Sequence, residues 1–170
     1  MYCCFTGHRP EHLPWGSNET DPRCIKLKKL LLSLIEQSVS DGYRNFYCGM
    51  ARGIDTYAAE AVLSLSEKNP EIQLHAVLPC PAQHEKWHER DRERFEILLE
   101  KCSTKTLMSP FYTNTCMLAR NRFMVDNSSR TIAVWNGFYK GGTAYTVRYS
   151  KSQNKQVYLI RPADSSFNVL

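Results

Sequence analysis

Short runs of β-branched, aromatic and cysteine residues alternate along the chain with longer stretches whose apolar residues recur every three or four positions. The short runs predict strands, and the longer stretches predict helices between them. The predicted strands are 2–6, 45–48, 73–80, 104–108, 131–135 and 156–160. The predicted helices are 21–40 or 22–40, 53–68, 82–101, 114–127 and 143–151.

Two of these helices carry a clear apolar stripe. In the first helix the stripe is Ile25, Leu31, Leu32, Ile35 and Val39. In the second it is Ile54, Tyr57, Ala58, Ala61, Val62 and Leu65. In the charged segment 82–101, we expect Trp87, Phe95 and Leu98 to face inward.

Strand and helix alternate so regularly that right-handed crossovers and a mostly parallel sheet are expected. The predicted fold is therefore an α/β domain with a doubly wound sheet and helices on both faces. A chain of 170 residues has the ordinary size of one domain, so we expect a single domain over 1–170.

Polar and glycine-rich segments follow four of the predicted strands, namely "TGHRP", "GMARGID", "PCPAQHE" and "NGFYKGGT". In open α/β sheets, ligands bind beyond the carboxyl ends of the strands, near the point where the strand order reverses. We therefore expect these four loops to converge on one edge of the sheet and to form a binding crevice.

Composition narrows the class of protein. Hydrophobic residues make up 42% of the chain, the formal net charge is +5, and no apolar stretch reaches the roughly 20 residues of a membrane span. No secretory signal is visible, and seven cysteines without a C-x-x-C pair fit a reducing compartment better than a disulfide framework. A cytoplasmic protein without membrane contact is expected, and its mild positive charge permits anionic ligands.

The segment "GMARGID" places Gly49 and Gly53 on either side of a short turn before a helix. The free N–H groups of a helix's first turn favour an anion, and Arg52 would add a charged donor. Asp55 is either a helix cap or an acceptor for ribose hydroxyls. Glycines are also common in such turns for backbone reasons alone, so this segment by itself leaves both interpretations open.

A second turn, "KGGT", repeats the arrangement, because Gly141 and Gly142 lead into a helix. Thr143 would either cap this helix or bind a phosphate oxygen at its first turn. Two such turns on one sheet edge favour a phosphate-bearing ligand. In "TGHRP", which begins with Thr6 and Gly7, Arg9 is a candidate anion contact, whereas His8 is equally well explained as a hydrogen-bonding loop residue.

The segment "RNRFMVDNS" has two interpretations. In the first it is a helix with one core face; in the second Arg120 and Asn121 reach the crevice, and Asp126 holds an arginine or a ribose.

The segment "HEKWH" at 84–88 matches the H-E-x-x-H pattern of zinc proteases. The residues after it are strongly charged and no later histidine supplies a third ligand, so a solvated amphipathic helix without bound metal is expected.

Four ordered segments, "FTGHRP", "GMARGIDTYAAE", "RNRFMVDNS" and "GGTAYTV", resemble the SLOG superfamily and its YpsA-like branch across nearly the whole chain. "GMARGID" is also similar to the turn of DprA, the DNA-processing protein of the same superfamily. The resemblance implies a Rossmann-like sheet and a nucleotide or nucleotide-derived ligand, such as an ADP-ribose or NAD-like molecule, at the glycine turns.

The LOG-type phosphoribohydrolases, which are relatives in that superfamily, carry a P-G-G-x-G-T-x-x-E motif. Here the corresponding segment is "KGGTAYTVR", which lacks the proline, the third glycine and the glutamate. A carboxylate is needed to assist cleavage of a glycosidic bond, and Asp55 or Asp126 would have to substitute for the missing glutamate.

Three hypotheses follow, of which a binding or sensor domain for a nucleotide-derived ligand is favoured. The alternatives are a nucleotide-processing enzyme and a DprA-like module for single-stranded DNA, for which a denser basic stripe is expected. No cofactor is certain, and the sequence does not decide whether the chain forms a homo-oligomer.

Overall fold

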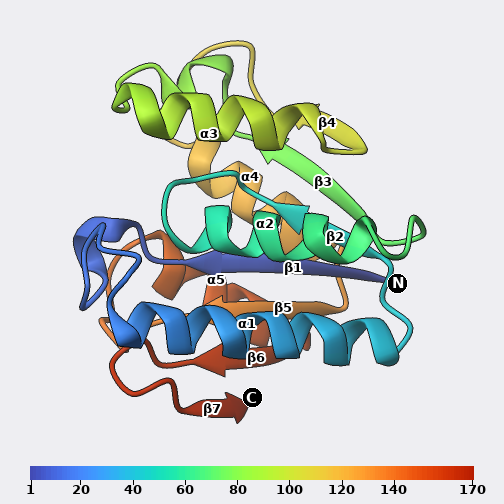
Figure 1. Ribbon diagram of the computed structural model, residues 1–170. Coiled ribbons are helices and arrows are strands. Elements are labelled where there is room, and N and C mark those ends of the chain that lie inside the picture. The colour runs from blue at the N-terminus through green and yellow to red at the C-terminus, as the bar shows by residue number, and fades with distance from the viewer.

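The computed structural model describes residues 1–170 and contains one seven-stranded sheet in the order β4-β3-β2-β1-β5-β6-β7 (Figure 1). The first six strands are parallel, which confirms the predicted doubly wound α/β fold. β7 pairs antiparallel with β6 and was not predicted from the sequence. The strands are β1 (Tyr2–Gly7), β2 (Asn45–Cys48), β3 (Gln73–Leu78), β4 (Thr104–Leu107), β5 (Arg130–Val134), β6 (Gln156–Ile160) and β7 (Phe167–Val169).

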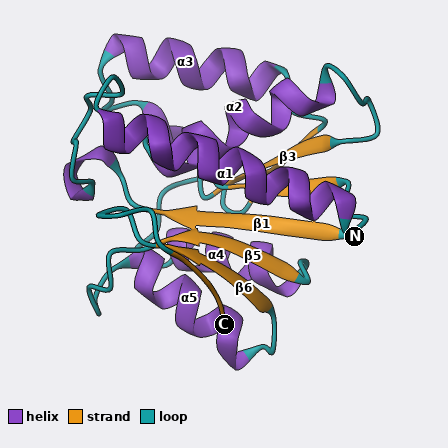
Figure 2. Cartoon of the chain, turned by 60° about the horizontal axis from the view of Figure 1, so that its bottom comes forward, coloured by secondary structure: helices purple, strands orange, loops and turns teal.

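Five α-helices cover both faces of this sheet. Figures 1 and 2 show the first three on one face and the last two on the other. Reversal of the strand order places the later crossovers on the opposite face, as right-handed connections require. The helices are α1 (Pro22–Ser40), α2 (Ile54–Ser66), α3 (Glu89–Glu100), α4 (Cys116–Asp126) and α5 (Gly142–Ser152).

Alternate residues of the central strands supply the two cores. Cys3 and Phe5 of β1 are in the large cluster beneath α1 and α2, whereas Cys4 packs with Met124 and Val125 of α4. Because both faces are covered, β1 is apolar at successive positions rather than alternating with polar residues. This explains why the short apolar runs in the sequence marked the strands correctly.

The predicted apolar stripe of the first helix is partly wrong. Ile25 is 43% exposed, whereas Cys24 and Leu27 are fully buried. Neighbouring positions on a helix point about 100° apart, so a core face that passes through 24, 27 and 31 turns position 25 toward solvent. The helix begins after Asp21, whose side chain accepts a hydrogen bond from the Arg23 N–H at 2.8 Å.

The predicted helix 82–101 is also wrong in its first part. A 3₁₀ turn covers Pro81–His84, and α3 starts only after His88, which has an extended backbone with ψ of 149°. Glu89 and Asp91 fall in the first turn of α3, where acidic side chains interact favourably with the helix dipole. His84 and His88 therefore do not share a helix face, and His84 instead stacks on Phe95 at 4.4 Å.

The remaining predicted elements lie within a few residues of the observed ones, and Phe95 and Leu98 are buried as expected. All seven cysteines are free thiols. No helix combines the length and the apolar character that crossing a membrane demands.

The strand order reverses between β1 and β5, which lie next to each other at the centre of the sheet. β1 continues into the loop that begins with His8, and β5 continues into the loop that leads to α5. A crevice between two such loops is the usual ligand position in doubly wound folds.

Candidate functional site

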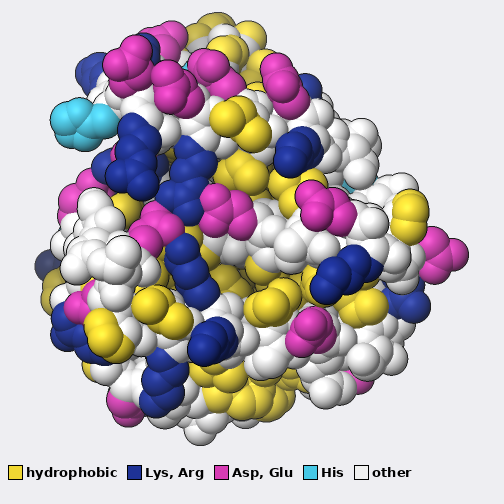
Figure 3. All heavy atoms as spheres, viewed as in Figure 1, with side chains coloured by type: hydrophobic (Ala, Val, Ile, Leu, Met, Phe, Trp, Pro, Cys, Tyr) yellow, Lys and Arg dark blue, Asp and Glu magenta, His cyan; other side chains and the backbone are white.

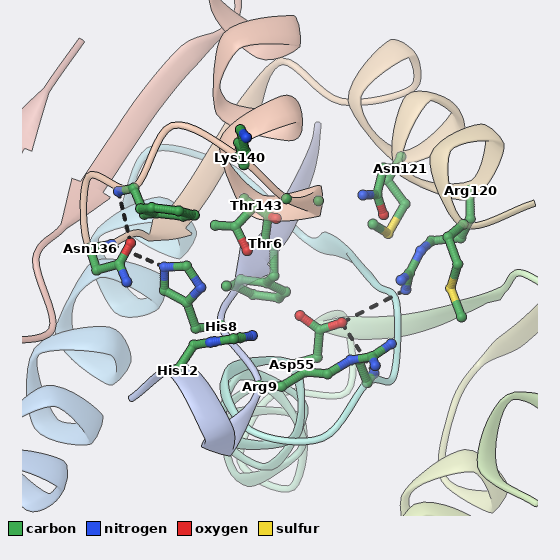
Figure 4. Close-up of a pocket in the computed structure, with 18 residues that line it drawn as sticks. Thr6, His8, Arg9, His12, Asp55, Arg120, Asn121, Asn136, Lys140 and Thr143 are labelled. Carbon is green, nitrogen blue, oxygen red and sulfur yellow. Dashed lines mark hydrogen bonds and ion pairs between the residues drawn. The ribbon is translucent and has the colours of Figure 1, made fainter. Parts of the chain in front are cut away.

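A cavity of about 480 Å³ opens at this reversal of strand order. Its walls come from the end of β1, the loop between β5 and α5, the inner side of α4, and the start of α2 (Figure 4). A volume of this size is within the range of small-molecule sites.

The amino terminus of α5 forms one wall. Gly141 is the N-cap residue, has φ of +97°, and carries no side chain that could cap the helix. The first N–H groups of an α-helix have no partner within the helix, so the donors of Gly142 and Thr143 are available at the cavity. Gly141, Gly142 and Thr143 all line it.

Arg120 of α4 lies at the opposite wall and is only 6% exposed. Its Nη1 atom is 3.8 Å from Oδ2 of Asp55, which is too far for a hydrogen bond. Neither Nε nor Nη1 of Arg120 has a hydrogen-bond partner. Buried guanidinium donors are normally satisfied, so these two enclosed nitrogens without partners are unusual for a folded protein.

Asp55, in the first turn of α2, points toward Arg120 in Figure 4. One carboxylate oxygen accepts a hydrogen bond from the Ala51 N–H at 3.2 Å. Burial raises the pKa of Asp55 above its usual value, and the positive charges of Arg120 and Arg9 oppose that rise.

Three glycines permit close packing at the wall of the cavity and behind it. A Cβ atom on Gly49 would lie 1.4 Å from Nη1 of Arg120, so the guanidinium occupies the space of the missing side chain. A Cβ on Gly7 would lie 2.4 Å from Ile54, and one on Gly53 would lie 2.6 Å from the His8 carbonyl oxygen. Gly53 also has φ of +83°.

His8 connects the two loops at the reversal of strand order. Its carbonyl oxygen accepts the Ile54 N–H at 3.2 Å, and its Nε2 accepts the Asn136 N–H at 3.1 Å. Burial lowers the pKa of His8, which favours the neutral imidazole that this second bond requires.

Positive charge prevails in the cavity lining. Arg9, Arg120 and Lys140 contribute three basic side chains, whereas Asp55 contributes the one carboxylate. In Figure 4, Arg9 and Arg120 approach Asp55 from different elements, and Lys140 lies above Thr143. The balance favours an anionic ligand.

The structure brings most of the predicted site residues together at this cavity. Those that line it are Gly7, Arg9, Asp55, Arg120, Asn121, Gly141, Gly142 and Thr143. Gly49 and Gly53 lie immediately behind it, in contact with Arg120 and with the His8 loop.

Two predicted residues are elsewhere. Arg52 forms ion pairs with Glu11 and with Asp91, and its guanidinium lies over the Trp87 ring at 5.9 Å. Asp126, at the end of α4, accepts a hydrogen bond from the Tyr149 hydroxyl at 2.8 Å. Neither side chain lines the cavity.

Arg52 belongs to a face on which charges of both signs are mixed. Figure 3 shows Lys and Arg interspersed with Asp and Glu over α1, α2 and α3. Arg94, for example, pairs with Glu19 at 2.5 Å and with Glu60 at 2.7 Å. This face is not a uniform basic stripe.

Among the lining residues that were not singled out from the sequence are His12, Asn136, Phe138 and Lys140. Their signal was their position in loops that follow predicted strands. No cluster of three or more His, Cys, Asp or Glu side chains is arranged to hold a metal ion.

Comparison with known proteins places the chain among relatives of matching length. It is 21% identical over 155 residues to the UPF0398 protein YpsA of Bacillus subtilis, a match that covers 89% of this chain and 85% of that protein. It is 25% identical over 152 residues to a UPF0398 protein of Bacillus pumilus, with 86% and 80% covered. A UPF0398 protein of Bacillus thuringiensis is 24% identical over 152 residues, with 88% and 82% covered.

A family model also matches residues 3–165, which include every element from β1 to α5 and the whole of β6. This model is YpsA, described as the YspA SLOG family. The match covers both glycine turns, the His8 loop and the α4 segment that together surround the cavity. The chain therefore belongs to the YpsA family of SLOG proteins.

Proposed function

We propose that this cavity binds a nucleotide or nucleotide-derived ligand through its phosphate, as a binding or sensor site. The observation that carries the proposal is Arg120, whose buried guanidinium has two nitrogens without hydrogen-bond partners. The uncapped N–H groups of α5 lie on the same cavity. Together they supply charge-assisted and backbone donors to one anion.

The rest of the lining favours a ligand larger than inorganic phosphate. The cavity of about 480 Å³ has apolar surface from Phe5, Met117, Met124 and Phe138 beside its polar groups. Sites of this kind bind an organic body through apolar contact and fix its orientation with a few polar groups. Asn121 and Thr143 line the cavity and would hydrogen-bond ligand oxygens, and Asp55 would hold Arg120 or accept from a ribose hydroxyl.

Thermal-shift measurement and calorimetry with AMP, ADP-ribose, NAD and inorganic phosphate test the proposal. A ligand at 100 times its dissociation constant stabilises the folded state by about 2.7 kcal/mol. The Asp55→Asn/Arg120→Met variant removes the guanidinium without leaving its carboxylate partner buried alone, and it should bind at least about tenfold more weakly. Arg52→Ala is the matched control because Arg52 does not line the cavity. Absence of stabilisation by every nucleotide at millimolar concentration would contradict the proposal.

A second candidate function is cleavage of a nucleotide's glycosidic bond. The specific observation that favours it is Asp55, the one carboxylate that lines the cavity. Its burial raises its pKa, as is common for catalytic acids. Release of free base from a nucleoside monophosphate, lost in Asp55→Asn, would establish the enzyme; binding without base release would favour the sensor.

The salt dependence of affinity distinguishes binding of single-stranded DNA from both of these functions. Contacts with a phosphate backbone release counterions, so DNA affinity falls steeply as ionic strength rises. A small ligand that is held by a few donors at one cavity should show a much shallower dependence. A steep salt slope with an oligonucleotide and no response to free nucleotides would favour the DNA-binding alternative.

A further inference from the structure

The mouth of the cavity carries an aromatic side chain with no ring partner. Phe138, in the loop between β5 and α5, lines the cavity and is 64% exposed. It is absent from the stacked aromatic pairs of the chain and from the cation–π contacts. Exposure of so large an apolar side chain at a concave site is a feature of ligand-binding surfaces.

The loop that carries Phe138 is held in place by hydrogen bonds from several directions. The Phe138 N–H donates to Oδ1 of Asn136 at 2.9 Å, and the Trp135 indole N–H donates to the Phe138 carbonyl at 2.9 Å. The Asn136 N–H in turn donates to Nε2 of His8 at 3.1 Å. The backbone on both sides of the ring is therefore fixed before any ligand arrives.

The next residue provides an internal comparison. Tyr139 is 72% exposed, yet the guanidinium of Arg148 lies 4.4 Å from its ring centroid and donates to its carbonyl at 2.7 Å. Tyr139 does not line the cavity. One of these neighbouring rings thus already has a partner on its face, while the ring at the cavity does not.

We infer that Phe138 is a stacking platform for the base of the bound nucleotide. The inference rests on the proposed function and deepens it, since the ligand must then contain an aromatic ring, which excludes a plain sugar phosphate as the preferred ligand. The phosphate is held by Arg120 and the start of α5, and the base contacts Phe138 at the mouth. Stacking of a base on an aromatic side chain tolerates different bases because each has a π face.

Affinity measured with two kinds of probe tests the inference. The probes are the four nucleoside monophosphates AMP, GMP, CMP and UMP, and ribose 5-phosphate, which has the same phosphate and sugar but no base. Phe138→Ala should weaken binding of the preferred nucleotide by about tenfold or more. The same variant should leave ribose 5-phosphate within about twofold of the wild-type value.

Tyr139→Ala is the matched control, because it removes an equally exposed neighbouring ring outside the cavity. It should bind the nucleotide as the wild type does. Both side chains are exposed, so unchanged thermal melting should confirm that both variants fold.

The outcomes separate the two proposals. Wild-type nucleotide affinity in Phe138→Ala, together with weaker binding in Asp55→Asn/Arg120→Met, would overturn the stacking role and leave phosphate binding standing. An equal loss of nucleotide and ribose 5-phosphate in Phe138→Ala would also overturn it, since the residue would then shape the whole cavity. Failure of these five probes, and of ADP-ribose and NAD as well, to bind the wild type would overturn both proposals.

Discussion

The two glycine turns of this chain, Gly49–Asp55 and Lys140–Thr143, look alike in sequence but differ in what fills them. At the first turn the start of α2 is closed by the chain itself, because the Ile54 N–H donates to the His8 carbonyl and Asp55 accepts from Ala51. At the second turn, the N-cap residue Gly141 has no side chain that could cap α5. The first backbone N–H groups of that helix are therefore free, and their residues line the cavity.

The difference shows that glycine serves two purposes at one sheet edge. At the first turn it permits close packing, because a Cβ on Gly53 would lie 2.6 Å from a carbonyl oxygen. At the second turn nothing lies within 4 Å of a Cβ on Gly141, and the glycine leaves the helix end open. The closed turn supports the site and the open turn supplies its donors.

The largest expected effect is at the closed turn. Gly53→Ala combines an unfavourable φ with a backbone clash, and these two sources of strain together should reduce stability by roughly 2–6 kcal/mol. Gly142→Ala meets only the Asn121 side chain at 3.7 Å and should change stability by less than about 1 kcal/mol. Urea unfolding of both variants checks the contrast, and equal losses would contradict it.

Arg120 connects the closed turn to the cavity, so its removal should affect stability as well as binding. Arg120→Met leaves Asp55 buried without its ion partner, and we expect a loss of about 3 kcal/mol. Asp55→Asn/Arg120→Met should recover much of that stability while binding stays weak. If the double variant were no more stable than Arg120→Met, the ion pair would not explain the loss.

The pH dependence of the unfolding free energy should reveal the contact between the His8 loop and the loop that follows β5. The pKa of His8 is lowered in the folded state from its ordinary 6.5, so the unfolded chain binds more protons in that range. Stability from this group is present above about pH 6.5 and is lost as pH falls below it.

His8→Gln replaces the imidazole acceptor with a carbonyl that does not titrate in this range. Unfolding free energies of the wild type and His8→Gln, measured from pH 7.5 to 5, report the contribution of His8. We expect this contribution to be about 1 kcal/mol, the size of one hydrogen bond. The wild type should lose more stability than the variant on acidification. Parallel curves would mean that His8 does not titrate as its burial implies.

Arg52→Ala should have the smallest effect, although Arg52 lies between the two glycines of the first turn. Arg52→Ala removes two partly exposed ion pairs, which together should contribute no more than about 1 kcal/mol. Nucleotide affinity should remain that of the wild type, because the side chain is outside the cavity. A tenfold loss of affinity would restore the interpretation of Arg52 as a direct phosphate ligand.

Much of the fold was predictable because both faces of the sheet are covered. Strands such as Asn45–Cys48 and Gln156–Ile160 are apolar runs of the expected length, and turn residues mark their ends. The short antiparallel β7 was missed because its Phe167–Val169 is exposed and lacks a core pattern. The interruption before α3 was missed because helical spacing continues through a segment that folds as a 3₁₀ turn and then passes through the extended backbone of His88.

The cavity was predictable only in outline. Loop positions after parallel strands placed Arg9, Asp55 and the Gly141–Thr143 turn near one another. The direction of Arg52 was not predictable, because it depends on Glu11 and Asp91 from distant parts of the chain. The sequence left open whether Arg120 reaches the crevice, because the position of its side chain depends on the space left by Gly49.

If the open start of α5 donates to a ligand phosphate, as we propose, two variants at Gly142 should differ sharply in affinity. Gly142 is the first helical residue, where proline is well tolerated but lacks the N–H donor. Gly142→Pro removes that donor and Gly142→Ala keeps it. Calorimetry with the preferred nucleoside monophosphate should show Gly142→Pro binding at least about tenfold more weakly than Gly142→Ala, at similar thermal stability. Equal affinities in the two variants would contradict the claim.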